Sequence, residues 1–129
     1  MQVQEEQVIL VENEKITEIL PAEEAGKRNL KASGYEKIDL QGKYILPGLI
    51  NMHVHLAGNG KPPKKQRDNE ALVKKIMSNG LTKAIAYNMV CGFAKDELYS
   101  GVTTIRTVGG LGDFDTRLRD DIAAGKKPG

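Results

Sequence analysis

The feature that most constrains this chain is a long apolar stretch that ends in two histidines. The stretch, KYILPGLINMHVHLA, runs from Lys43 to Ala57, and its apolar core spans Ile45 to Val54. Continuous apolar runs of this kind are typical of parallel strands that are buried on both faces. His53 and His55 close the run and are the only histidines in the chain. The sequence therefore predicts a parallel strand with two imidazoles at its C-terminal end.

The spacing of the two histidines indicates a metal site. Residues two apart on a β-strand project from the same face, about 6.5–7 Å apart along the strand. Neutral imidazole binds zinc and similar ions, and it suits Zn²⁺, Fe²⁺, Co²⁺ or Ni²⁺ better than Mg²⁺ or Ca²⁺. An isolated pair of this kind is more often structural than functional. Sites in parallel α/β folds collect at the C-terminal ends of strands, however, so this position favours half of a metal site.

The segments before the apolar stretch have the pattern of short strands and turns. A short helical turn fits within Ala22–Gly34, and tight turns fit at Glu12–Glu14 and at Gln41-Gly42. The predicted strands are Gln7–Val11, Lys15–Leu20, Tyr35–Leu40 and Lys43–Leu46.

Helical periodicity follows the histidines, with one further strand between the helices. The second helix carries Leu81, Ile85, Met89 and Phe93 four apart on one apolar face, and we expect Met89 and Cys91 to pack in the core. The order strand, helix, strand, helix predicts a parallel sheet with right-handed crossovers. The predicted elements are a helix capped by Asp68 and ending at Met77, a helix from about Leu81 to Tyr99, a strand within Gly101–Gly110, and a helix Phe114–Ala124 capped by Asp113 or Asp115.

Two loops invite a functional interpretation. Ala57–Asn69 contains several glycines and prolines, which predict an exposed loop. Its basic residues could attract a carboxylate-bearing substrate, but we favour a solvated surface loop; they are Lys61, Lys64, Lys65 and Arg67. The glycine-rich turn Gly109–Gly112 lacks the spacing of a phosphate-binding fingerprint.

Two motifs together carry a resemblance to a known family. LPGLINMHVHL (Leu46–Leu56) and GVTTIRTVGG (Gly101–Gly110) closely resemble the amidohydrolase superfamily of metal-dependent hydrolases. The resemblance runs from about Val8 to the last residue and covers only the N-terminal portion of that family. It implies an α/β fold: residues 1–47 as part of a small β-sandwich, and residues 48–129 as the first βα units of a (β/α)8 TIM-type barrel.

The resemblance implies hydrolysis of C–N bonds, in an amide, cyclic amide, amidine or dipeptide, by a metal-activated water. The cofactor would be one or two divalent ions, with zinc favoured, and His53 and His55 are carried over as metal ligands. The family's other ligands and its proton-shuttling aspartate come from later strands, so no catalytic residue is assigned. A complete barrel takes about 250 residues, so we expect the 129 residues alone to be inactive and to need the rest of the barrel or a homo-oligomer.

Two other functions stay open, and several classes are disfavoured. The chain could be a non-catalytic subunit that packs against a complementary chain, or a self-contained binding domain with incidental histidines. A net charge of +2 argues against nucleic-acid and anionic-membrane partners. The single cysteine, and an N-terminus unlike a signal peptide, predict cytoplasmic residence.

Overall fold

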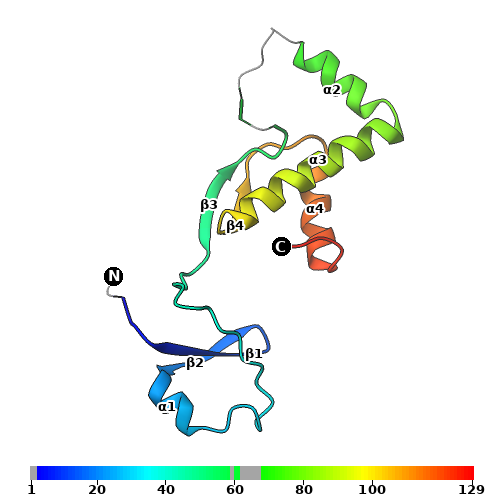
Figure 1. Cartoon of the computed structure of the whole chain (residues 1–129). Helices are drawn as coiled ribbons and strands as arrows, with labels where there is room; N and C mark the ends of the chain where they lie inside the picture. Colours follow the sequence, from blue (N-terminus) through cyan, green and yellow to red (C-terminus); the bar gives the residue numbers. More distant parts are fainter. Residues whose placement is uncertain (1–2, 59, 62–67) are drawn as a thin grey trace. The chain divides into compact units, whose positions relative to one another are not determined.

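The chain forms two compact units, one ending at Ile45 and the other beginning at Leu46. The computed structural model describes residues 3–58, 60–61 and 68–129 (Figure 1). The predicted basic cluster therefore lies outside the described residues, apart from the exposed Lys61. None of the helices in the described ranges is both long enough and apolar enough to cross a membrane.

The first unit is built on an antiparallel hairpin. Strands β1 (Gln7–Glu12) and β2 (Lys15–Pro21) pair, and helix α1 (Ala22–Lys27) follows directly. The turn residues Asn13 and Glu14 have φ angles of 48° and 64°, the left-handed conformation of a tight hairpin turn. Both strands, the turn and the short helix were predicted, and these predictions are confirmed.

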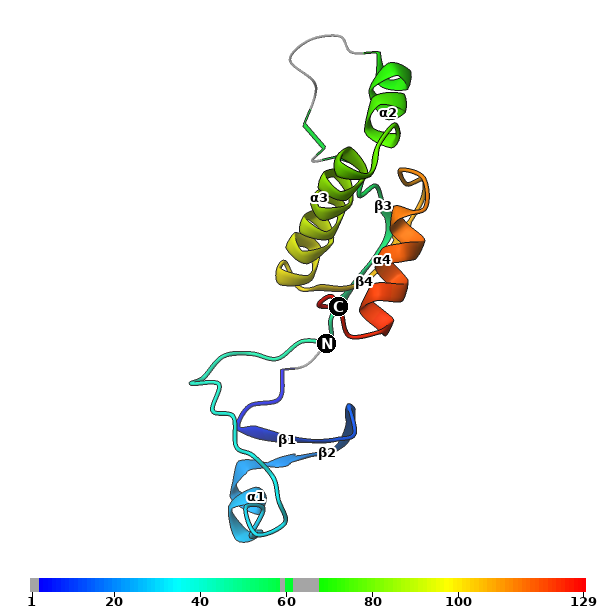
Figure 2. The ribbon, with the colours of Figure 1, turned by 90° about the vertical axis from the view of Figure 1, so that its right-hand side faces the viewer.

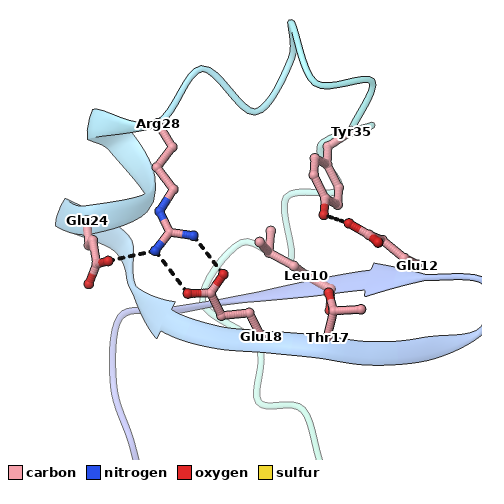
Figure 3. Close-up of polar contacts among 7 residues, drawn as sticks. All are labelled: Leu10, Glu12, Thr17, Glu18, Glu24, Arg28 and Tyr35. Carbon is pink, nitrogen blue, oxygen red and sulfur yellow. Dashed lines mark hydrogen bonds and ion pairs between the residues drawn. The ribbon is translucent and has the colours of Figure 1, made fainter.

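Polar contacts hold the helix of this unit to its hairpin. The Arg28 guanidinium donates to both Glu18 carboxylate oxygens, at 2.6 and 2.9 Å, and to Glu24 Oε1 at 2.7 Å (Figure 3). The hydrogen bonds from Arg28 hold the pKa of Glu18 below its usual range. On the same side of the hairpin, the Tyr35 hydroxyl donates to Glu12. A small apolar core lies beneath, formed by Leu10, Leu20 and Ala25.

The two further strands predicted for residues 35–46 are wrong. Gln41 and Gly42 do form a turn, with φ angles of 52° and 75°, and the Lys43 amide donates to the Leu40 carbonyl at 3.1 Å. The segments on either side, Tyr35–Leu40 and Lys43–Leu46, have no strand structure. Their apolar residues did fit a strand pattern, but the structure pairs neither segment with another strand. A strand needs a neighbouring strand to hydrogen-bond with its backbone N–H and C=O groups, so an apolar pattern alone does not produce one.

The second unit contains a two-stranded parallel sheet with helices packed on it. Strand β3 (Leu49–Val54) pairs with β4 (Val102–Thr107) in parallel, which confirms the predicted parallel pairing. The helices α3 and α4 lie on the same side of this sheet (Figures 1 and 2). The helices of the unit are α2 (Asn69–Met77), α3 (Gly80–Tyr99) and α4 (Phe114–Ala123).

The helix boundaries follow from capping residues in the sequence. Asp68 accepts a hydrogen bond from the Ala71 amide at 3.0 Å, as predicted, and Asn79 does the same for Thr82 at 2.9 Å. Gly101 has a φ of 95°, the left-handed conformation that commonly follows the last turn of a helix, here α3. Asp113 occupies the N-cap of α4 but makes no side-chain capping bond.

The predicted core face of α3 is wrong for three of its four residues. Leu81, Ile85 and Met89 are 73%, 54% and 56% exposed. Phe93, the fourth, is half-buried and packs against the core, as does the half-buried Cys91. Helix α3 is apolar on more than one face, so four-residue spacing alone could not identify the face that meets the sheet. The core of the unit consists of Val54, Leu56, Ala86, Tyr87, Val90, Phe114 and Leu118.

A buried tyrosine joins α3 to α4. The Tyr87 hydroxyl donates to Asp121 Oδ2 at 2.6 Å, and its ring meets Phe114 edge-to-face at 5.7 Å. The Arg117 guanidinium lies 4.0 Å from the ring centroid of Tyr87. Burial raises the pKa of Tyr87, and the hydrogen bond from Tyr87 lowers the pKa of Asp121. Both shifts favour the neutral phenol beside the ionised carboxylate.

Candidate metal centre

The two histidines converge at the C-terminal end of β3. His53 lies in the strand and His55 one residue beyond its end, and both side chains are exposed. Their Nε2 atoms are 3.2 Å apart, and the rings meet edge-on with centroids 5.1 Å apart. The predicted geometry, with ring nitrogens able to reach one common point, is confirmed.

An irregularity in the strand pairing sets the backbone of His53. Asn51 is opposite Ile105 and Val54 is opposite Thr107, so β3 has one more residue than β4 in this interval. Bulges of this kind redirect side chains and are common beside functional sites. The Asn51 side-chain oxygen accepts a hydrogen bond from the His53 amide at 3.2 Å. Asn51 thus supplies a partner for His53 where the ladder is interrupted.

The second strand fixes the orientation of the His55 ring. The Val108 amide donates to the Val54 carbonyl at 3.1 Å, which extends the pairing of the strands to the glycine turn. The Gly109 carbonyl oxygen then lies 3.3 Å from His55 Nδ1. A proton on Nδ1 that donates to this carbonyl leaves the lone pair on Nε2 free to face a metal, which is the usual outer contact of a metal-bound histidine.

Gly109 was predicted only as part of a flexible turn, and its contact with His55 was missed. Its φ of 102° favours glycine over any other residue. The signal available in the sequence was that Gly109 closely follows the predicted second strand, which is expected to lie beside the strand that ends in the two histidines. No sequence pattern, however, states which carbonyl a loop presents.

The separation of the two Nε2 atoms fits two positions of a zinc-type site. Nitrogens at about 2.0–2.1 Å from one ion with tetrahedral angles are about 3.3–3.4 Å apart, close to the 3.2 Å between His53 and His55. In the described part of the chain, no group of three or more His, Cys, Asp or Glu residues is arranged to hold a metal. The pair therefore offers two ligands and leaves the remaining positions to other groups.

One concave space of the second unit lies away from the histidines. A cavity of about 210 Å³ is lined by residues of α3, by Leu118 of α4 and by residues near the C-terminus. Its polar groups come from Asn88, Cys91, Lys95 and Lys127. Neither histidine contributes to its lining, so we do not assign it to the metal centre.

Comparison with known proteins gives relatives of two kinds. No family model matches the chain. The chain is 46% identical over 52 residues to a dihydroorotase of Trichlorobacter lovleyi, covering 40% of this chain and 11% of that protein. It is 33% identical over 132 residues to an imidazolonepropionase of Pseudoalteromonas atlantica, covering 91% of this chain and 31% of that protein. For an imidazolonepropionase of Salmonella paratyphi A the identity is 30% over 120 residues, covering 82% and 28%.

The chain spans less than a third of the length of each of these relatives. Dihydroorotase and imidazolonepropionase are both hydrolases of one superfamily, the one that the two sequence motifs resemble. The similarity is distant and partial, and it confirms the predicted resemblance to the N-terminal portion of that superfamily.

Proposed function

From this amidohydrolase-like sequence, we propose that the chain supplies the first ligand pair of a metal-dependent hydrolase acting on C–N bonds. The substrate would be an amide, cyclic amide, amidine or dipeptide. The observation that carries the proposal is the convergence of His53 Nε2 and His55 Nε2 to 3.2 Å at the C-terminal end of a parallel strand. Distant similarity to two hydrolases supports the choice of reaction class.

The residues of this chain hold and orient the ion rather than transfer protons. His53 and His55 would hold a divalent ion, preferably zinc and as one or two ions in the complete site, which would lower the pKa of a bound water to about 7 and polarise a carbonyl. The binding atoms would be the two Nε2 nitrogens, and the Gly109 carbonyl would accept from a proton on His55 Nδ1. Proton transfer to the leaving nitrogen would be the task of a residue outside this pair.

We further propose that residues 48–129 are the first βα units of a barrel and residues 1–47 part of a small β-sandwich. Parallel pairing of β3 and β4 supports this arrangement. Leu49, Ile50 and Met52 of β3 are 62%, 64% and 58% exposed. Covering one such side chain is worth about 1.5–3 kcal/mol. We propose that the remaining barrel, or another copy of the chain, covers these side chains of β3. We propose the cytoplasm as the location of the protein.

The second candidate is a non-catalytic subunit. What favours it is that the described residues place only two metal-ligating side chains together. Such a subunit would pack against a complementary chain and would keep its two histidines without supplying a full metal site. Its metal affinity alone would be weak, because two imidazoles provide fewer ligands than the three or more of a catalytic zinc site.

The function can be tested with the protein isolated from its native source. We expect metal to survive dialysis and a panel of amides, cyclic amides, amidines and dipeptides to include a substrate. His53→Ala and His55→Ala should each remove stoichiometric metal and the hydrolysis together. Retained metal and activity in both variants would contradict the proposal, and stable assembly without metal or hydrolysis would favour the non-catalytic subunit.

A further inference from the structure

A carboxylate packs against the glycine turn behind His55. Asp115 belongs to the first turn of α4, where a negative charge is favoured by the helix dipole. A Cβ atom added to Gly110 would lie 2.5 Å from Asp115 Cγ and 2.8 Å from Asp115 Oδ1. Real Cβ atoms essentially never approach other atoms so closely, so a side chain at position 110 would require the Asp115 carboxylate to move.

The start of α4, which carries this carboxylate, is anchored in the core. Its neighbour Phe114 is 2% exposed and is fixed in the core against Tyr87, which anchors the start of α4. Asp115 Oδ1 is buried and has no hydrogen-bond partner within the described residues. A buried carboxylate oxygen without a partner is costly. Its position against Gly110 therefore needs an explanation other than its own hydrogen bonding.

The contact between Asp115 and Gly110 is connected to the candidate metal centre through Gly109 and His55. Gly110 follows Gly109, whose carbonyl oxygen lies 3.3 Å from His55 Nδ1. Gly109 has a φ of 102°, which favours glycine. Because glycine has no side chain, the residue itself offers no side-chain contact that could hold its carbonyl in place. Among the described residues, the atoms within 4 Å of a Cβ built at Gly109 belong to the His55 ring, at 3.9 Å. Asp115 packs against this turn at Gly110, and the hydrogen bond between Val108 and Val54 holds the turn from the strand side.

We propose that Asp115 is a positioning residue for His55. Its carboxylate, held by α4, packs against Gly110 and keeps the Gly109 carbonyl at His55 Nδ1, so that Nε2 stays free to bind metal. The metal part of this inference rests on the proposed function. The effect on the protonated nitrogen of His55 does not, because it exists in metal-free protein.

The test measures the ring nitrogens and the metal affinity separately. ¹⁵N spectra of metal-free protein, recorded at mildly alkaline pH, identify which nitrogen of His55 carries the proton. Competition with a chromogenic chelator gives the Zn²⁺ affinity. The variants are Gly110→Ala, Asp115→Ala and the two combined. Gly58→Ala is the matched control, since nothing lies within 4 Å of a Cβ at Gly58.

We expect wild type and Gly58→Ala to keep the proton on His55 Nδ1. Gly110→Ala and Asp115→Ala should each shift protons towards Nε2 and weaken Zn²⁺ binding about tenfold, the lower end of losses seen for outer contacts of metal sites. In the combined variant the alanine methyl fills the space left by the carboxylate, so both quantities should return towards wild type. General destabilisation would not produce this recovery.

Unchanged tautomers in Gly110→Ala and Asp115→Ala, or no recovery in the combined variant, would overturn the proposal. If Gly110→Ala fails to fold, Asp115→Ala, which introduces no clash, decides the outcome. If His53→Ala and His55→Ala leave Zn²⁺ binding unchanged, the proposed function fails. The tautomer shift would then still establish the positioning role of Asp115.

Discussion

Replacing Gly48 by alanine should separate the start of β3 from β4. The Leu49 amide donates to the Gly101 carbonyl at 2.8 Å, so the two backbones are already in close contact at this point. Leu49 is opposite Val102 and Ile50 is opposite Thr104, which leaves Thr103 as an extra residue on β4. The side chain of Thr103 occupies the place where a Cβ atom of residue 48 would stand.

The size of the effect follows from which atoms collide. A Cβ at Gly48 would lie 2.6 Å from Thr103 Cβ, with the Thr103 hydroxyl and methyl closer still. Rotating the threonine side chain cannot move its Cβ, so the backbones themselves must separate. Overpacking of this kind costs about 1–3 kcal/mol, and we expect the upper end. That is a large part of a typical domain stability of about 5–15 kcal/mol.

Urea unfolding, followed by far-ultraviolet circular dichroism, measures the change in the free energy of unfolding. Gly92→Ala is the matched control, because Gly92 lies inside α3 with nothing within 4 Å of an added Cβ. This control should be neutral or stabilising by up to about 1 kcal/mol. An unfolding midpoint for Gly48→Ala equal to that of wild type would refute the argument that Thr103 requires glycine at position 48.

Three further outcomes are expected. Glu18 has a lowered pKa in the folded state, so the stability that its ionised carboxylate contributes is present above its unfolded pKa of about 4.3. This stability is lost as the pH falls through the folded-state pKa. Arg28→Gln, which removes the hydrogen bonds to Glu18, should therefore make the unfolding of the first unit less dependent on acid pH. Tyr87→Phe should lower the free energy of unfolding by about 1 kcal/mol, and an unchanged value would mean that the bond to Asp121 adds nothing. Gly109→Ala, which must adopt a φ of 102°, should displace the carbonyl from His55 and shift its ring proton, as ¹⁵N spectra would show.

Much of the second unit could be predicted because local signals agreed with one another. Asp68 marked the start of α2, Gly101 marked the end of α3, and the β-branched residues after Gly101 marked β4. The convergence of His53 and His55 followed from alternation along a strand. These features depend on residues close together in sequence, which is the range over which pattern and capping arguments apply.

The failures came from contacts between distant residues. Whether Tyr35–Leu40 forms a strand depends on a partner strand, which alternation within the segment does not report. The buried face of α3 was selected by Tyr87 and its contact with α4, not by the larger aliphatic residues that led the prediction. The folding of a glycine turn brought the carbonyl of Gly109 to His55 and placed Gly110 against the carboxylate of Asp115.

The measurement that tests the central claim most directly is a Zn²⁺ titration followed at the ring nitrogens of both histidines. Two imidazoles that share one ion should show the ¹⁵N signals of His53 Nε2 and His55 Nε2 shifting together, saturating at one ion per pair. His53→Ala should strongly weaken the response of His55, and His55→Ala that of His53. Nε2 signals that do not respond to Zn²⁺, or that respond independently of each other, would contradict the assignment of His53 and His55 as a shared metal site.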